Sequence, residues 1–346
     1  MLTEQSPVAN ERRIARGVLR GRSVAVVGEV VVSAKQAEGT RTFVDETLLA
    51  RARLTRREAK RMDRFSLLAL AAVRELTDSI EPAARASCGF VCGNMMGGWT
   101  FTEPQLQALH TDGPLAVSPY LASAWFPAAP QGQVSIHAGI RGYAKSIVTD
   151  RCAGAQAIAH AAERIAANRA ELMIAGAVES PVTAFVEAAV RHSGQPPHVL
   201  TEAAAFVLLA PRQAASFEAD DAAAAVTVRA HRTIPVGKQS TAAAAYQIAA
   251  LWEHEASKTP QLVVCACGTQ HSQTALATSI VHELFEGRHP QVLFPAREHG
   301  ETLGASSAIA TALARRSLIT GAAGNAVLVL TLGHFSMDAL WLERSA

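Results

Sequence analysis

Residues 146–158 read Ser146-Ile-Val-Thr-Asp-Arg-Cys-Ala-Gly-Ala-Gln-Ala-Ile158, and this stretch decides the fold. A short β-branched run leads into a turn and then into a run of small residues, which predicts a strand, a sharp turn and a closely packed helix. On both sides of residues 146–158, apolar strand-like runs alternate with alanine-rich helical runs such as 57–76, 153–168 and 304–317. That alternation is typical of a layered α/β protein.

The alternating pattern occurs twice along the chain, on either side of a polar, alanine-rich connection near residues 216–225. We expect a polar N-terminal segment over residues 1–21, one half over 22–215 and a second half over 222–346. The apolar runs 204–209 and 326–331 are predicted to be equivalent strands of the two halves. Runs that are apolar at nearly every position are typical of strands buried between layers of helices.

Composition narrows the class of protein. The chain has 346 residues, 49% of them hydrophobic, and a net charge of +2, so it can bury a large core and has no charge excess for nucleic acid or an anionic membrane. The apolar runs are too short for a membrane-spanning helix and the first residues lack a secretion signal, which predicts a cytoplasmic protein. Five cysteines, with no second ligand pair near Cys265 and Cys267, predict neither a disulfide framework nor a zinc site.

Further short motifs accompany the 146–158 stretch. They are Val91-Cys-Gly-Asn-Met-Met-Gly-Gly98, residues 172–179, Thr201-Glu-Ala-Ala-Ala-Phe206, Cys267-Gly-Thr269, Gly300-Glu-Thr-Leu-Gly-Ala305 and Leu332-Gly-His-Phe-Ser336. In this order they resemble motifs of the β-ketoacyl synthases, a family with the thiolase fold. The resemblance implies a layered αβαβα fold built from two similar halves.

The resemblance also implies where catalytic groups would stand. A condensing β-ketoacyl synthase has a reactive cysteine at the turn, where the N-terminus of the helix favours a thiolate. Counting back from Gly154 and Ile158, Arg151 occupies that position, and the two histidine positions hold Cys267 and Glu301. A guanidinium stays protonated and cannot attack a thioester, and an anion at position 301 opposes an enolate. These departures predict that the chain alone does not catalyse decarboxylative condensation.

Residues 113–142 sharpen the resemblance. The motifs there are Gly113-Pro114, Val117-Ser-Pro-Tyr120, Ala124-Trp-Phe126, Gln131-Gly-Gln-Val-Ser-Ile136 and Arg141-Gly142. In the same order they closely resemble those of the chain-length factors, the ketosynthase β-subunits of type II polyketide synthases.

A resemblance to chain-length factors implies a heterodimer with a catalytic ketosynthase, served by an acyl carrier protein whose phosphopantetheine arm carries the growing chain. The β-subunit walls the tunnel that holds this chain at the interface. The candidate wall residues are Tyr120, Ser123, Ala124 and Phe126. The candidate gating loop is Gly333, His334 and Phe335. The small Ser123 and Ala124 favour a long channel that suits a polyene. The alternative for Trp125 and Phe126 is plain packing in the core of the interface, where aromatic residues are common.

Alternatives stay open for the degenerate turn. Arg151 is either a structural residue that pairs with an acid and fills the unused pocket, or a donor to a carboxylate or thioester of the partner's substrate. In a different class of function, the chain is an acyltransferase in its own right, with Cys152 as nucleophile and His271 or His299 as base. That hypothesis requires the turn to slip by one residue. Glu301 is expected to cap the helix that follows it, and neither hypothesis implies a bound cofactor or metal.

Overall fold

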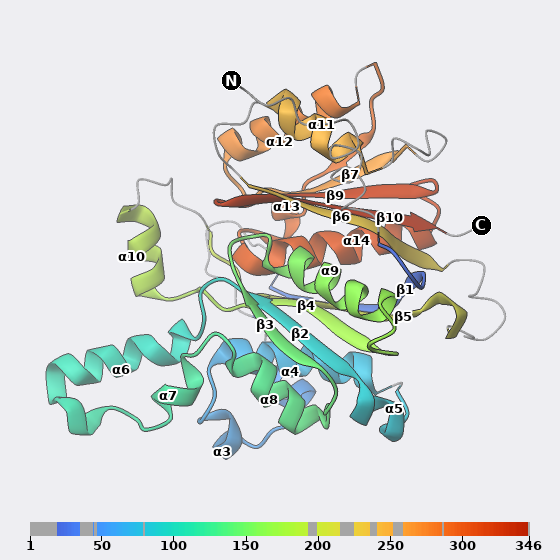
Figure 1. The fold of residues 1–346 in the computed structure, drawn as a ribbon. Helices are drawn as coiled ribbons and strands as arrows, with labels where there is room; N and C mark the ends of the chain where they lie inside the picture. Colours follow the sequence, from blue (N-terminus) through green and yellow to red (C-terminus); the bar gives the residue numbers. More distant parts are fainter. Residues whose placement is uncertain are drawn as a thin grey trace, which may run out of the picture.

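The computed structural model describes residues 19–34, 44, 47–78, 80–192, 199–214, 225–235, 241–251, 259–285 and 287–344. Figure 1 shows two stacked sheets with one layer of helices between them and a further layer outside each. The order is helices, sheet, helices, sheet, helices, which confirms the layered αβαβα prediction. Most of the expected N-terminal segment 1–21, and the connection between the expected halves, lie outside the described residues.

Within the described ranges, the strands follow one another in the order β3-β2-β4-β5-β1-β6-β10-β9-β7-β8. Their bounds are β1 Val24–Ser33, β2 Gly89–Asn94, β3 Ala144–Val148, β4 Met173–Glu179, β5 Ala203–Pro211, β6 Val226–Pro235, β7 Leu262–Ala266, β8 Gln291–Leu293, β9 Ala326–Leu332 and β10 Ser336–Arg344. The two stacked sheets meet where β1 pairs with β6 over residues 24–26. The strand β3 lies at one end of this order and β8 at the other.

The two halves have the same topology. In the first half, β1, β5 and β4 are antiparallel neighbours, and β4, β2 and β3 are parallel neighbours. In the second half, β6, β10 and β9 are antiparallel, and β9, β7 and β8 are parallel. The fold is therefore built from two similar halves, as the resemblance implied.

One strand equivalence predicted from the sequence is wrong. Residues 204–209 lie in β5, whose counterpart by position is β10, and residues 326–331 lie in β9, whose counterpart is β4. All four strands are buried along almost their whole length. Because burial on both faces makes such strands apolar at most positions, their patterns do not distinguish one from another.

The helices form three layers in Figure 1, with α9 and α14 between the sheets, α4 and α8 on the outer face of the first sheet, and α11 and α12 on the outer face of the second. The α-helices are α2 Leu48–Ala52, α3 Arg56–Ala59, α4 Arg64–Thr77, α5 Pro82–Ser87, α6 Trp99–Asp112, α7 Leu121–Ala124, α8 Ala129–Ala138, α9 Ala153–Ala166, α10 Ala184–His192, α11 Thr241–Ala249, α12 His271–Leu284, α13 Ala296–His299 and α14 Ser306–Ile319. The 3-10 turns are η1 Pro114–Ala116, η2 Arg212–Ala214 and η5 Leu303–Ala305. No helix of the described ranges is long and apolar enough to span a membrane.

The helix predicted over 57–76 is two helices. Thr55 and Glu58 form a reciprocal capping box at the start of α3. Asp63 begins α4 by accepting a hydrogen bond from the Phe65 N–H at 2.9 Å. Both capping signals can be recognised in the sequence. They outweigh the helical spacing of apolar residues, which continues without interruption from α3 into α4.

Small residues bring the N-termini of α9 and α14 together in the middle layer. A Cβ on Gly154 would come within 2.8 Å of the Ala308 side chain, so glycine allows this close approach. The Ser307 hydroxyl donates to the Arg151 carbonyl at 2.7 Å and accepts from the Ala155 N–H at 2.9 Å. These bonds fix the turn at 149–152 against the second half of the fold.

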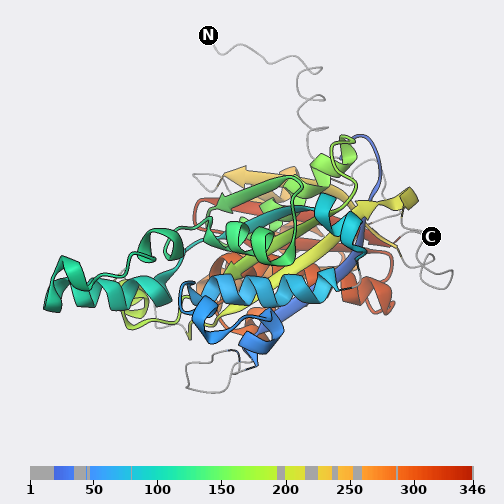
Figure 2. The ribbon, with the colours of Figure 1, turned by 90° about the horizontal axis from the view of Figure 1, so that it is seen from below.

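An arm made of α6, η1 and α7 projects from the body in both ribbon views (Figures 1 and 2). None of the fourteen residues of α6 is buried. The arm also has exposed large apolar side chains, which are Leu109, Leu115, Tyr120, Trp125 and Phe126. A surface of this kind is typical of a contact with another protein.

Candidate functional site

The candidate site lies at the turn 149–152, between β3 and the N-terminus of α9. The Thr149 N–H donates to the Asn94 carbonyl at 3.2 Å, which holds the end of β3 beside the end of β2. Three positions far apart in sequence meet at this turn: Arg151 itself, Cys267 directly after β7, and Glu301 shortly before η5. The structure therefore brings together the three positions that the sequence identified as degenerate.

Arg151 and Glu301 form a buried, two-pronged ion pair. Arg151 Nε lies 3.1 Å from Glu301 Oε1, and Arg151 Nη2 lies 2.6 Å from Oε2. The side chain of Arg151 is 10% exposed and that of Glu301 is fully buried. Glu301 Oε1 also accepts the Leu303 N–H at 3.1 Å, at the start of η5, although the N-cap residue of η5 is Thr302 and that of α14 is Ala305. The prediction that Arg151 pairs with an acid is confirmed.

Gln273 and the loop after β7 complete the surroundings of the pair. With its amide oriented to satisfy its neighbours, Gln273 accepts from Arg151 Nη1 at 3.1 Å and donates to the Cys267 carbonyl. Gly268 has a φ of +74°, and a Cβ there would come within 2.5 Å of Glu301 Oε2 and 2.9 Å of Arg151 Nη2. The glycine thus lets the backbone lie directly against the ion pair.

The electrostatics of the site keep it charge-balanced and unreactive. Burial by itself lowers the pKa of Arg151, but the Glu301 carboxylate more than offsets this, so the pKa lies above its ordinary value and the guanidinium stays charged. Burial raises the pKa of the Cys267 thiol to about 12, against the opposing effect of Arg151. The site therefore offers a neutralised ion pair and a protonated thiol, neither of which is a nucleophile at neutral pH.

Cys152 points away from this ion pair. Its Sγ donates to the Ser336 carbonyl on β10 at 3.4 Å, and its N–H donates to Asp150 Oδ1 at 3.0 Å. The residue is fully buried, and burial, followed by the charges of Asp338 and Asp150, raises the pKa of its thiol far above the ordinary value. The turn has not slipped, because Arg151 is the residue that meets Glu301 and Cys267. Cys152 is the N-cap of α9, but burial and the carboxylates of Asp338 and Asp150 keep its thiol protonated.

The two histidines considered as bases are placed elsewhere. His299, at the end of α13, is buried with Nδ1 2.7 Å from the Ser33 hydroxyl at the end of β1. His271 is the exposed first residue of α12. In this arrangement His299 is oriented toward β1, so the acyltransferase hypothesis lacks a positioned base.

Asp150 binds the predicted gating loop of Gly333, His334 and Phe335. One carboxylate oxygen accepts the N–H groups of Phe335 at 2.7 Å and Ser336 at 3.4 Å. A Cβ on Gly333 would overlap both carboxylate oxygens, so a glycine is required at that point. The rings of His334 and Phe335 pack edge to face, and Phe335 is 71% exposed. Burial raises the pKa of Asp150, but the N–H groups of Phe335 and Cys152 outweigh it and hold the pKa below its ordinary value.

The predicted tunnel residues surround α7 at the base of the arm. Tyr120 and Phe126 are 39% and 52% exposed, and Ser123 is exposed as well. Ala124 is buried, because the turn at Gly98 packs against its carbonyl. Arg61 of the α3–α4 connection stacks on Tyr120, with its Cζ 5.1 Å from the ring centroid. Three of the four side chains are therefore open to a partner.

Sequence reasoning missed three buried acidic residues and one half-buried glutamine that support the site. They are Asp150, Gln273, Glu179 and Glu202. Glu179 accepts the N–H groups of Met95 and Met96, and burial raises its pKa to about 8. Glu202 pairs with both prongs of Arg64 (2.6 and 2.7 Å). The sequence signal for Glu179 and Glu202 was an acidic residue at the end of an otherwise apolar strand. Because a buried charge needs a partner, such a residue indicates a buried polar contact.

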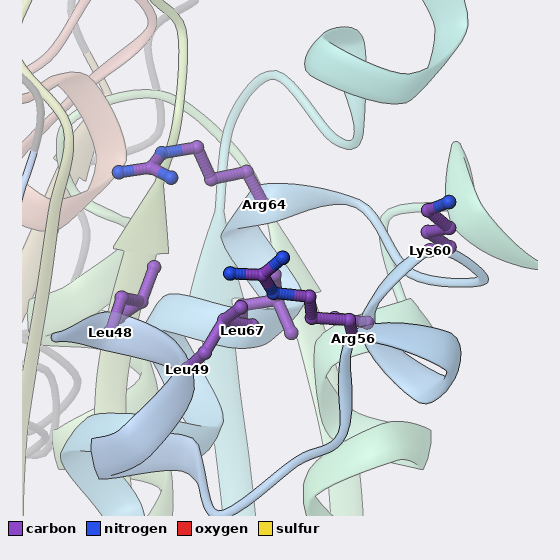
Figure 3. A pocket seen from close by; sticks show the side chains of 7 residues that line it. Leu48, Leu49, Arg56, Lys60, Arg64 and Leu67 are labelled. Atoms are coloured by element: carbon purple, nitrogen blue, oxygen red, sulfur yellow. The ribbon is translucent and has the colours of Figure 1, made fainter. Parts of the chain in front are cut away.

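A pocket of about 550 Å³ lies beside α4 (Figure 3). It is lined by Leu48, Leu49, Arg56, Ala59, Lys60, Arg64 and Leu67. Its floor is apolar and its rim is cationic, and Arg64 connects it to Glu202. Among the described residues, no group of three or more histidine, cysteine or acidic side chains could hold a metal ion.

Comparisons with known proteins agree with this geometry. Residues 29–194 match the family model described as "Beta-ketoacyl synthase, N-terminal domain". Residues 29–194, just under half of the chain, therefore resemble the N-terminal domain of the β-ketoacyl synthases. The chain is 36% identical over 129 residues to a polyketide beta-ketoacyl synthase 2 of Streptomyces halstedii, covering 36% of this chain and 31% of the relative. It is 37% identical over 92 residues to the actinorhodin polyketide beta-ketoacyl synthase 2 of Streptomyces coelicolor, covering 27% of this chain and 22% of the relative.

These matches span less than a third of the length of the curated relatives. Two solved structures resemble this β-ketoacyl synthase-like chain over 94% of its length. One is a type II polyketide synthase acyl-carrier protein in complex with its ketosynthase (TM-score 0.73, 21% identity, 100% of that chain). The other is the ishigamide ketosynthase/chain length factor (TM-score 0.72, 18% identity, 100% of that chain). The resemblance to the ketosynthases and chain-length factors of type II polyketide synthases, and the thiolase-like fold, are thereby confirmed.

Proposed function

We propose that this chain is a chain-length-factor-like, non-condensing subunit of a ketosynthase heterodimer in type II polyketide or polyene biosynthesis. The observation that carries the proposal is the Arg151–Glu301 ion pair, which fills the place of the nucleophile and of one catalytic histidine. A subunit with an unreactive centre of this kind contributes shape to the assembly rather than a reacting group.

A heterodimer is supported by the surface around the edge strand β3. β3 pairs with β2 on one side, and its other side is the end of the strand order. An exposed edge strand is a ready template for pairing with another chain. Large apolar side chains are exposed on β3 and on the elements before it, namely Trp125, Phe126, Ile136 and Val148 at 49%, 52%, 74% and 54%. Such side chains are typical of the centre of a protein interface.

The exposed side chains at the base of the arm support a role in setting chain length. Tyr120, Ser123 and Phe126 face outward beside this surface, where a partner's substrate channel would end against them. A change from Ser123 to phenylalanine adds a ring at the proposed wall, and we expect the assembled synthase to release shorter products. A matched Thr111→Phe change on the exposed end of α6 serves as the control. Unchanged product length with Ser123→Phe would remove that residue from the wall.

An acyl carrier protein is the proposed source of the chain. The exposed cations of residues 56–61 are Arg56, Arg57, Lys60 and Arg61. Among the described residues, no carboxylate forms an ion pair with Arg56 or Lys60 on the rim of the pocket in Figure 3. Such a surface suits an acidic protein or the phosphate of a phosphopantetheine arm.

The test is intact-protein mass spectrometry after incubation with an acyl-loaded carrier protein, with and without the ketosynthase partner. The proposal expects the acyl group on the partner and none on this chain, in a heterodimer that co-purifies. An acyl adduct on Cys152 would overturn it and make the chain an acyltransferase in its own right. A Cys152→Ala variant in the same incubation distinguishes an adduct there from one elsewhere.

A further inference from the structure

A cluster of four polar side chains lies along the open edge of the first sheet, and we call Tyr143, Lys145, His160 and Arg164 the edge cluster. Tyr143 Oη lies 2.9 Å from His160 Nε2. The Arg164 guanidinium lies over the Tyr143 ring, with its Cζ 4.3 Å from the ring centroid. Lys145 and Arg164 both act electrostatically on His160. The four residues therefore form one connected group from β3 and α9.

The edge cluster faces the side on which a second chain would pair with β3. Side chains alternate along a strand, so Lys145 shares its face with Tyr143 and Ile147. Both of these pack partly against the core around α9. On α9, His160 and Arg164 are four residues apart and lie on one line of the helix, where the residues are not fully buried. The cluster thus lies beside the backbone groups that β3 leaves open.

The cluster carries unbalanced positive charge. Among the described residues no carboxylate pairs with Lys145 or Arg164, and Arg164 Nε, itself buried, has no hydrogen-bond acceptor there. Burial and the two neighbouring cations lower the pKa of His160, so it stays neutral at pH 7. Glu163 is the one acidic residue of α9, and it lies about 100° around the helix from Arg164.

We propose that the edge cluster selects the subunit that pairs with β3, by accepting a partner that presents carboxylates opposite Lys145 and Arg164 and by rejecting a second copy of this chain. The inference rests on the proposed heterodimer. It adds the chemical feature of the correct partner, which is carboxylates opposite Lys145 and Arg164. A carboxylate on the partner would pair with the exposed Lys145 and with the accessible part of the half-buried Arg164 guanidinium. The stack on Tyr143 holds the guanidinium ready for such a contact.

Symmetry explains the rejection of a second copy. A twofold pairing places the same surface patch of each copy against the other. Two copies joined at β3 would bring both edge clusters together, since Lys145 lies within the five residues of that strand. Like charges opposed across strands or buried at an interface are unfavourable, so the cluster acts against the homodimer.

The test uses sedimentation equilibrium on the full chain alone and on its mixture with the ketosynthase partner, at pH 7.5 in 50 and 500 mM NaCl. For the unmodified chain alone we expect weak self-association that strengthens with salt. For Lys145→Glu we expect self-association at least tenfold tighter at low salt and no longer strengthened by salt, because each edge cluster then holds one cation and one anion and the repulsion between the two copies is removed. With the partner, Lys145→Glu and Arg164→Glu should each weaken the heterodimer at least tenfold.

Arg288→Glu is the matched control, because it makes the same charge change beside β8 at the opposite end of the strand order. Equal self-association of the Lys145→Glu and Arg288→Glu variants, or a salt-insensitive homodimer of the unmodified chain, would overturn the inference. A heterodimer that forms but ignores both substitutions at the edge cluster would overturn the inference and leave the proposed function standing. A ketosynthase that fails to bind the unmodified chain would instead count against the proposed function.

Discussion

Removing the arginine of the Arg151–Glu301 pair leaves a carboxylate in the interior with no cation beside it. In an Arg151→Met variant, Glu301 keeps the Leu303 N–H at 3.1 Å but loses both contacts to the guanidinium. Because the Glu301 side chain is fully buried, water cannot replace them. Breaking a buried ion pair from one side costs about 3–5 kcal/mol, and we expect this loss in the free energy of unfolding.

A double variant separates the charge from the packing. Replacing Arg151 with methionine and Glu301 with glutamine removes both charges while it keeps an acceptor for the Leu303 N–H. We expect the double variant to be more stable than Arg151→Met by about 2 kcal/mol or more, since no buried charge is left unpaired.

Urea denaturation followed by tryptophan fluorescence measures these differences, at one protein concentration for all variants. The Cys267→Ser change, beside the pair but uncharged, is the control for local packing. The account of the site would be refuted if Arg151→Met cost less than about 1 kcal/mol, or if the double variant were no more stable than the single one. Either result would mean that Glu301 finds water or another cation in solution.

Three further outcomes follow from the geometry. Gly333→Ala puts a methyl group against the Asp150 carboxylate, so proteolysis in the 333–336 loop should accelerate severalfold. Gly132→Ala in α8, where no atom lies within 4 Å of the added Cβ, should have no such effect. Burial raises the pKa of Asp63 to about 6 from an ordinary 3.8, so stability falls as pH rises through this window. The stability of Asp63→Asn relative to the unmodified chain should therefore increase by about 3 kcal/mol between pH 3.5 and pH 7 in urea titrations. Iodoacetamide should leave Cys152 unlabelled in the native protein at pH 8 and label it after denaturation; rapid native labelling would contradict its burial.

The sequence was sufficient for the order of the elements around the degenerate turn. The small residues from 153 onward, with Gly154 at the contact with Ala308, predicted the tight helix that the structure contains. The identity of the three degenerate positions was also predictable, because each lies within a short motif. That Arg151 pairs with Glu301 in particular was not, since the two are 150 residues apart and many acids were available.

Other features depend on tertiary contacts that leave no pattern in the sequence. Strands β5 and β9 are both almost wholly buried, so apolar content could not show that they occupy different places in their sheets. The contact between Asp150 and the 333–336 loop joins two segments 185 residues apart. The orientation of Cys152 toward Ser336 follows from the position of β10 relative to α9, which spacing along the chain does not encode.

Arg151 and Glu301 each supply the counter-charge of the other, so a change of either one alone leaves a buried charge unpaired. This dependence opposes the recovery of catalysis by single substitutions. An Arg151→Cys change would place a thiol at the N-terminus of α9, but beside an uncompensated carboxylate that disfavours the thiolate. A Glu301→His change alone would leave the guanidinium buried without its anion. Either single substitution toward a catalytic centre therefore produces a destabilised protein. For the non-condensing subunit proposed above, the cost of these single changes opposes condensation chemistry together with the missing groups.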